Sequence, residues 1–575
     1  MKRVPFFDNP VLRGQLPTWR ARLVLILMLL GFLTLAGRAL YLQGISTEFL
    51  QAQGERRYER TIPLPAMRGK ILDRNGAVLA SSVPARGIFV IPEDFKKASP
   101  EQMAALAKKL EMPLADIRSR VDDDRNFVYL KRQVSMDVAQ EIAALKVPGI
   151  HQLGENKRFY PDGNVMGHVV GFTNIEDRGQ EGVELTFNEL LSGTPGSRRV
   201  IRDRLGNIIE DVQAIVPPMD GRDLRLSIDT RLQFVVYKAL QDALEEHGAK
   251  AGAAVVLDVR TGEVLALANL PTFDPNNRET FKPINLRNVA ITDTFEPGSI
   301  MKPFTAALAL DLGRITPATM FDTGNGRFRY QGSTISDVSR NGVIGVADVL
   351  RRSSNIGMTM ISERLQAREM WDRFTELGLG QAPQLGFPGA APGRLRPWDR
   401  WRLIEKATMA YGYGLSVSLL QMARAYTVFA RDGDMVSLSL VKRESEPTSV
   451  KVYPPKIAVS VRAMLEAAAG PDGAKLAQVQ GYRVAGKSGT ARKIIDGKYS
   501  MSRYRSSFVG FAPVSDPRIV VAVSIDEPDK GAYYGGRVAA PVFSRIVGGS
   551  LRVMGVKPDA PFESTIVAHA PERVQ

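Results

Sequence analysis

The stretch EPGSIMKPF, residues 296–304, decides how the C-terminal half of the chain is interpreted. Its Pro-Gly pair ends whatever precedes it, and helix-prone residues 305–312 follow, so Ser299 is predicted at a helix N-terminus. There the free backbone N–H groups and the helix dipole favour a negatively charged oxygen. A spacing of three places Lys302 on the same helix face as Ser299. Because an apolar surround lowers the pKa of a lysine, the pair indicates a serine nucleophile with a lysine base.

Two residue types are missing from the region around this pair. None of the four histidines lies between residues 251 and 555, so a serine there has no histidine base close in sequence, and a histidine-pair metal site is excluded. The chain has no cysteine, which excludes disulfides, thiolate nucleophiles and cysteine metal sites. We therefore expect no metal and no cofactor. The histidines are His151, His168, His247 and His569, of which His168 is expected to be a buried structural residue.

Two further motifs follow in the sequence. Ser353-Ser354-Asn355 lies in the helix-rich stretch 346–365, where its hydroxyl could relay a proton and its amide could hold a substrate carbonyl. Lys487-Ser488-Gly489-Thr490 is the one Lys-Ser/Thr-Gly sequence in the chain. On a strand, Lys487 and Ser488 would project to opposite faces, and Gly489 would allow a substrate backbone to approach closely.

The first two motifs each have a second match that we interpret as structural. Ser439 and Lys442 repeat the Ser-x-x-Lys spacing in an alternating run, residues 437–441, that predicts a strand with solvent-facing serines. Ser339-Arg340-Asn341 precedes a glycine and is typical of a turn.

Taken in order, the three motifs resemble the signature of penicillin-binding proteins and serine β-lactamases. The resemblance implies an α+β fold, with a penicillin-binding/β-lactamase-like transpeptidase domain. It extends to an N-terminal β-rich pedestal domain, whose motifs resemble those of class B penicillin-binding proteins. These are residues 68–76, Arg158 with Pro161, Gly163, His168 and Gly171, and Gly182 with Glu184. Residues 295–298, 533–536 and 540–543 look most like the septal cell-division type.

The resemblance implies a reaction for the first two motifs. Ser299 would attack the penultimate D-Ala carbonyl of a peptidoglycan stem peptide and expel the terminal D-Ala. Lys302 would take the serine proton, and Ser353 would help to protonate the leaving amine. A stem-peptide amine would then accept the acyl group, which makes a crosslink during septal cell-wall synthesis.

The resemblance also implies how substrate is held. Asn355 would hold the donor peptide, Lys487 would supply positive potential, and the hydroxyls of Ser488 and Thr490 would bind the terminal carboxylate. The backbone N–H groups of Ser299 and Thr490 would form the oxyanion hole. Gly489, Tyr533 and Tyr534 complete the expected substrate-binding set. Two residues depart from the usual pattern: Ser354 stands in place of Asp, which puts a side contact in doubt, and Ser488 in place of Thr, which keeps a hydroxyl.

A single apolar run near the N-terminus predicts a membrane anchor. Residues 23–42 contain one charge, Arg38, and twenty helical residues span about 30 Å, the thickness of a bilayer core. Five basic residues against one acid precede this run, which favours a cytoplasmic N-terminus and a periplasmic remainder. The alternative is a cleaved signal peptide. No second run is comparable, so we expect a single-pass protein of the bacterial inner membrane, placed by the resemblance at the division septum.

The chain pattern predicts five regions: a basic tail (1–22), the transmembrane helix (23–42), the pedestal (55–220), the transpeptidase domain (224–555) and a loose tail (556–575). Local signals are a hairpin at Asn75-Gly76, helix over 99–121, and a helix opened by a Thr230/Gln233 capping box. The formal charge is +15, but the basic residues are scattered. This favours attraction to a membrane or an acidic polymer over nucleic-acid binding.

Three rival functions remain. Residues 481–488 match the Walker A pattern, but a P-loop needs a long helix next, and Asp496-Gly497 instead predicts a hairpin turn. A serine β-lactamase shares the three motifs but needs neither pedestal nor anchor. A non-catalytic penicillin-binding sensor or division scaffold would use mainly the pedestal. By resemblance, the expected partners are stem peptides, β-lactams as covalent inhibitors, the septal glycan polymerase and other division membrane proteins.

Overall fold

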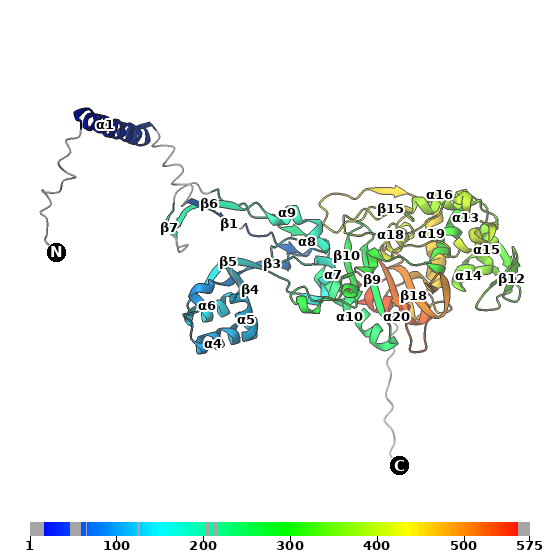
Figure 1. Cartoon of the computed structure of the whole chain (residues 1–575). Helices are drawn as coiled ribbons and strands as arrows, with labels where there is room; N and C mark the ends of the chain where they lie inside the picture. Colours follow the sequence, from blue (N-terminus) through cyan, green and yellow to red (C-terminus); the bar gives the residue numbers. More distant parts are fainter. Residues whose placement is uncertain are drawn as a thin grey trace, which may run out of the picture. The chain divides into compact units, whose positions relative to one another are not determined.

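The computed structural model describes residues 17–45, 59–64, 66–122, 127–202, 208–211 and 216–561 (Figure 1). The chain divides into two compact units, one of residues 1–66 with 194–219 and the other of residues 67–193 with 220–575. Most of the predicted basic tail and the end of the predicted C-terminal tail lie outside the described residues. The α+β fold expected from the sequence is confirmed.

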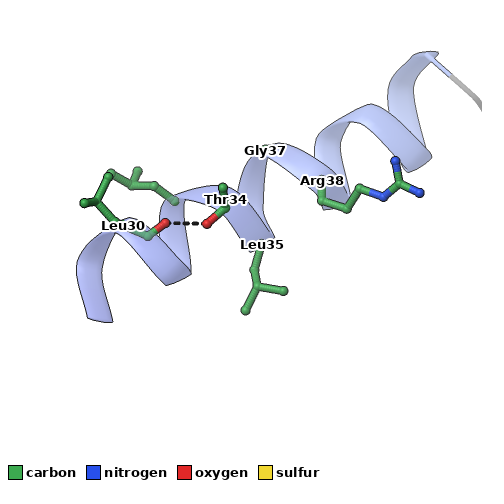
Figure 2. A pocket seen from close by; sticks show the side chains of 6 residues that line it. Leu30, Thr34, Leu35, Gly37 and Arg38 are labelled. Atoms are coloured by element: carbon green, nitrogen blue, oxygen red, sulfur yellow. Dashed lines mark hydrogen bonds between the residues drawn. The ribbon is translucent and has the colours of Figure 1, made fainter. Parts of the chain in front are cut away.

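The first unit contains the apolar helix and a small sheet. Helix α1 (Thr18–Leu40) continues into a π-helical turn, η3 (Tyr41–Ile45), and none of its residues is buried. Figure 2 shows the Thr34 hydroxyl directed at the Leu30 carbonyl one turn earlier, to which it donates a hydrogen bond. A polar side chain satisfied within its own helix suits a hydrocarbon environment. By length and composition, helix α1 is long and apolar enough to cross a membrane. The antiparallel sheet β1-β6-β7 joins Glu59–Leu64, Gly196–Arg202 and Ile208–Asp211.

A mixed five-stranded sheet begins the second unit, with order β4-β3-β2-β8 and β5 also paired to β3. The predicted hairpin at Asn75-Gly76 is confirmed, since Leu72 of β2 pairs with Val78 of β3. The predicted helix over 99–121 is present as two helices, α4 and α5. The strands are β2 Ile71–Leu72, β3 Val78–Val90, β4 Val128–Ser135, β5 Ile150–Phe159 and β8 Leu224–Arg225, and the helices are α3 Pro92–Phe95, α4 Pro100–Leu110, α5 Leu114–Val121 and α6 Met136–Ala144.

A buried ionic cluster crosses this region. Glu184 is completely buried and accepts one hydrogen bond from Arg68 Nε at 2.6 Å and another from Arg158 Nε at 2.7 Å. His168 is also buried, and its Nε2 lies 2.7 Å from the Asn285 carbonyl oxygen, which confirms its expected structural role. His168 lies in α7 (Gly167–Val170) and Glu184 in α8 (Gly182–Thr186), and the neighbouring short helices are η4 Gly163–Val165 and α9 Asn188–Ser192.

An antiparallel sheet of order β10-β9-β19-β18-β17 forms the centre of the C-terminal part (Figure 1). Because strand side chains alternate between faces, Val256 of β9 joins the core beneath helices α10 and α20, while Val255 joins the larger core on the other face. Helices α13 and α18 belong to that larger core. The elements are β9 Ala251–Asp258, β10 Val264–Leu270, β17 Ala485–Ile495, β18 Lys498–Ala512, β19 Ile519–Asp526, α10 Thr230–His247, α13 Lys302–Asp311, α18 Leu419–Ala430 and α20 Gly535–Val553.

Shorter elements complete the helical side of the domain. The helices are α11 Pro283–Leu286, α12 Val289–Thr292, α14 Val346–Arg351, α15 Asn355–Glu363, α16 Ala367–Glu376, α17 Leu403–Met409 and α19 Pro455–Ala468, with 3-10 turns η5 Arg278–Thr280, η6 Gly298–Met301, η7 Trp398–Arg400 and η8 Lys475–Ala477. The short strands are β11 Met320–Asp322, β12 Arg327–Tyr330, β13 Ser333–Ser336, β14 Val343–Gly345, β15 Asp434–Val436 and β16 Ser449–Lys451.

Two local predictions are wrong. The N-cap of α10 is Asp229, whose carboxylate accepts the Arg231 N–H, whereas the Thr230 hydroxyl donates to Asp73 from the pedestal. The predicted strand over 437–441 is not formed, because β15 ends at Val436 and the following residues make only isolated bridges.

Candidate active site

The Lys302 side chain is fully buried, and its amine contacts the second motif. Its Nζ donates to the Ser353 backbone oxygen at 2.6 Å, to Ser353 Oγ at 3.1 Å and to Asn355 Oδ1 at 2.9 Å. Ser299 lies one turn earlier, in η6, and is half-buried. Among the described residues, none holds the Ser299 hydroxyl in a hydrogen bond. The fold therefore joins the first two motifs through Lys302, whereas the predicted contact between Lys302 and the Ser299 hydroxyl is not made as a hydrogen bond in this structure.

Electrostatics oppose the ammonium form of Lys302, and a neutral amine, which has two N–H groups, can keep only two of its three contacts with Ser353 and Asn355 as donor. Burial removes water from the ammonium group, and the positive charge of Lys487 adds to this, so the pKa of Lys302 lies well below its ordinary value. The carboxylate of Asp337 acts in the opposite direction but is the smallest of the three influences. A lysine that has lost its proton can accept one from an alcohol, which is the property required of a base.

The backbone at Ser353 is held in an unusual conformation by a neighbouring strand end. Ser353 has a φ of +58°, in the left-handed region that costs a non-glycine residue about 1–2 kcal/mol. Asp337, just after β13, accepts the N–H groups of Asn355 and Ile356 at 2.6 and 3.0 Å, and also the Ser354 hydroxyl. These bonds fix the turn that presents both Ser353 oxygens to Lys302.

Asp337 is the supporting residue that the sequence reasoning missed. Ser354 occupies the position at which the second motif usually has Asp, so the sequence did not show whether the contact that this Asp makes is kept. In the structure, Ser354 caps α15 by accepting the Gly357 N–H, and Asp337 supplies the missing carboxylate from outside the motif. Asp337 lies sixteen residues before Ser353 and nothing in the sequence marks it, so no signal was available there.

Strand β17 brings the third motif against η6. Lys487 is buried, and its Nζ donates to the Ser488 carbonyl oxygen at 3.1 Å. A Cβ added at Gly489 would lie 3.1 Å from the Pro297 carbonyl oxygen and 2.5 Å from Ser507 Oγ, so only glycine fits there. The close approach seats the strand directly beside the turn that carries the nucleophile candidate. No helix follows Lys487, since β17 continues into a hairpin with β18, and this excludes the P-loop alternative.

The two predicted tyrosines lie beside this strand. The Tyr533 ring stacks on Tyr504 of β18, with centroids 4.2 Å apart, and on Tyr534, with centroids 4.5 Å apart. The next residue, Gly535, donates its N–H to Thr490 Oγ1 at 2.9 Å. The loop before α20 is therefore tied to the third motif, and Tyr533 and Tyr534 form an aromatic surface next to it.

Gly412 supplies a test of how tightly the serine turn is positioned. Its φ is +89°, and an added Cβ would lie 2.1 Å from the Gly298 carbonyl oxygen, so Gly412→Ala should displace the Ser299 turn. We expect about a tenfold or greater loss in the rate of acylation by penicillin. Gly414→Ala is the matched control, because its φ is +84° but its Cβ would make only ordinary contacts with Met409. Equal rates in the two variants would contradict the tight positioning.

Family comparisons agree with this arrangement. The model described as the penicillin binding protein transpeptidase domain matches residues 252–548, and the penicillin-binding protein dimerisation domain matches residues 63–226. The chain belongs to the class B penicillin-binding proteins. Among named members, the probable peptidoglycan D,D-transpeptidase PenA of Neisseria gonorrhoeae is 42% identical over 565 residues, 97% of each chain. Peptidoglycan D,D-transpeptidase FtsI of Escherichia coli K12 is 40% identical over 94% of this chain and 93% of its own length.

Solved structures of penicillin-binding proteins also resemble it. The transpeptidase domain of Burkholderia pseudomallei penicillin-binding protein 3 is 52% identical, with a TM-score of 0.55, and covers 58% of this chain and 98% of its own. Penicillin-binding protein 3 of Mycobacterium tuberculosis, solved with aztreonam, is 28% identical, with a TM-score of 0.68 over 87% of this chain and 99% of its own.

Proposed function

We propose that this class B penicillin-binding protein is a peptidoglycan D,D-transpeptidase that works through an acyl-enzyme on Ser299. The observation that carries the proposal is the buried Lys302, one turn after Ser299 and hydrogen-bonded to Ser353 and Asn355. Neutral Lys302 takes the Ser299 proton as the oxygen attacks the penultimate D-Ala carbonyl. Ser353, bonded to the same amine, returns a proton to the leaving D-Ala.

The remaining site residues hold the donor peptide in this proposal. Asn355 orients the peptide, and Lys487 with the hydroxyls of Ser488 and Thr490 attracts the terminal carboxylate. The backbone N–H groups of Ser299 and Thr490 stabilise the oxyanion. Gly489 leaves room for the peptide backbone beside β17, and Tyr533 and Tyr534 border its side chains. A stem-peptide amine completes the crosslink.

The site of covalent modification tests this function. Full-length protein in detergent is incubated with a fluorescent penicillin, digested and mapped by mass spectrometry. We expect one adduct, on the peptide that contains Ser299, and none in a Ser299→Ala variant. An adduct on another side chain would contradict the mechanism. Rapid release of hydrolysed drug would instead favour the β-lactamase alternative.

The pH dependence of acylation is a second expected result. The reaction needs Lys302 neutral, so the rate should rise with pH through the lowered pKa of that lysine. It also needs Lys487 charged, and burial lowers the pKa of Lys487 to about 8, so the rate should fall as pH rises through about 8. Stopped-flow acylation over about pH 5 to 10 measures the rise and the fall of the rate. A Lys487→Gln variant should be slower and lack the falling limb; a fall that persisted in it would count against this assignment.

We propose further that α1 is a retained anchor in the bacterial inner membrane, with the N-terminus cytoplasmic and the catalytic domain periplasmic at the division septum. The apolar character of α1 and the basic residues ahead of it support this orientation. Septal glycan polymerase and other division membrane proteins are the proposed partners. Protease treatment of spheroplasts should digest the catalytic domain but spare an N-terminal tag, and the reverse pattern would overturn the orientation.

A further inference from the structure

Glu296, three residues before Ser299, carries a carboxylate oxygen that has no partner. Its Oε1 accepts the Gly414 N–H at 2.7 Å and the Tyr499 hydroxyl at 3.2 Å. Its Oε2 is buried without a hydrogen-bond partner in the described part of the chain. A buried carboxylate oxygen left unpaired is costly and uncommon, so its persistence needs a reason.

The groups around Glu296 suit a cation. The rings of Tyr413 and Tyr499 have centroids 6.0 Å apart at an interplanar angle of 76°, and Tyr411 lies 6.0 Å from Tyr413. Glu296 adds to burial in raising the pKa of both Tyr413 and Tyr499, which places its carboxyl group beside these two rings, and burial raises the pKa of Glu296 itself, which suits it to take up a proton. Carboxylate and aromatic faces together are the chemistry that binds an ammonium group.

No cation of the described protein occupies this position. No salt bridge joins Glu296 to a lysine or arginine among the described residues. Arg492 of β17 is close enough to lower the pKa of Tyr413, but its Nη1 donates to the sulfur of Met501 at 3.3 Å. Tyr499 is 47% exposed, so one wall of the cluster borders solvent. A cation from solvent would therefore reach the buried Oε2 of Glu296 by displacing the Tyr499 side chain.

Glu296 with its tyrosines and the Ser299 turn lie beside different positions along strand β17. Gly489 contacts Pro297 and Ile300, whereas Tyr499 pairs with Ile494, five residues further along the strand. Glu296 therefore lies on the side of Ser299 toward the hairpin tip. Three residues of chain span at most about 11 Å, so the backbones of Glu296 and Ser299 are no further apart than this.

We propose that Glu296, with Tyr413 and Tyr499, binds the ammonium group of the acceptor stem peptide and takes its excess proton. This inference rests on the proposed transpeptidase function. The proton passes from the ammonium nitrogen to Glu296 Oε2 and leaves a neutral amine. The amine lone pair then attacks the ester carbon, the bond to Ser299 Oγ breaks, and a second amine proton passes through Lys302 to Ser299 Oγ.

A Glu296→Gln variant tests the proposal, because glutamine keeps an oxygen acceptor for Gly414 and Tyr499 but removes the charge. A D-alanyl thioester acylates the full-length protein, and the acyl group then partitions between water and an added amine. With glycinamide, which is cationic, we expect the ratio of aminolysis to hydrolysis to fall about tenfold. With hydroxylamine, which is uncharged at neutral pH, the ratio should change less than about twofold. Glu279→Gln, at an exposed carboxylate, is the matched control for overall charge.

Thermal unfolding adds a readout that a structural role would not give. Removing an unpaired buried charge should leave the melting temperature of Glu296→Gln equal to or above that of the wild type. An unchanged glycinamide ratio, equal losses with both nucleophiles, or a melting temperature well below the wild type would overturn the ammonium site. Failure of the wild type to form any acyl-enzyme would instead overturn the proposed function.

Discussion

Replacing Lys302 by methionine should slow acylation by penicillin about a thousandfold or more while the protein remains folded. Methionine is unbranched and close to lysine in length, so it can fill the fully buried space, but it cannot take the Ser299 proton. Ser353 and Asn355 lose the donor they share, which should cost about 1–3 kcal/mol of stability. Stopped-flow measurement of the adduct gives the rate, and circular dichroism reports the fold.

Lys406 offers a matched control for the loss of a buried lysine. It is 9% exposed, lies in α17 and donates to the Leu365 carbonyl oxygen at 2.8 Å, far in sequence from any motif. We expect Lys406→Met to acylate within about threefold of the wild type. Near-normal acylation by Lys302→Met, or an equal loss in both variants, would contradict the role of Lys302 as the base.

The second large effect is expected in the pedestal. Glu184→Gln keeps the side-chain shape but leaves Arg68 and Arg158 buried beside a neutral amide, and breaking such a pair costs about 3–5 kcal/mol. The local free energy of opening can be measured by hydrogen exchange of the amides in α8 and β3. Acylation of Ser299 by penicillin reports separately on the fold around the nucleophile candidate, and we expect the Glu184→Gln variant still to be acylated.

An exposed ion pair supplies the comparison for Glu184. Glu176 pairs with Arg132 at 3.0 Å, but its side chain is 59% exposed, so Glu176→Gln should change stability by less than about 1 kcal/mol. If Glu184→Gln destabilised the pedestal no more than this control, the buried cluster would not be what holds the region together.

The sequence was most informative where function restricts residues tightly. The three motifs were predicted to form one site, and the structure brings Lys302 of the first motif against Ser353 and Asn355 of the second, more than fifty residues further along the chain. Local signals also predicted the hairpin at Asn75-Gly76 and the presence of α10. These patterns are local, and each can be seen within a few residues of chain.

Contacts between distant segments were not predictable in this way. The N-cap of α10 was predicted one residue too late. The Thr230 hydroxyl, which was expected to form the cap, instead donates a hydrogen bond to Asp73 of the pedestal. The importance of Asp337 depends on a turn that returns it to the start of α15. Sequence alone could not reveal the unpaired oxygen of Glu296 either, because whether a buried oxygen finds a hydrogen-bond donor depends on which donors the fold brings near it.

The close packing of backbone around the Ser299 turn has a consequence for antibiotic resistance. Gly298 meets Gly412, and Gly489 meets Gly535, with main-chain atoms so close that an added Cβ would lie 2.1–2.2 Å from a carbonyl oxygen. A wall made of backbone cannot be reshaped by exchanging side chains. A bacterial population under selection by a β-lactam would therefore be expected to adapt at neighbouring side chains, such as Tyr533 and Tyr534, instead of at this backbone.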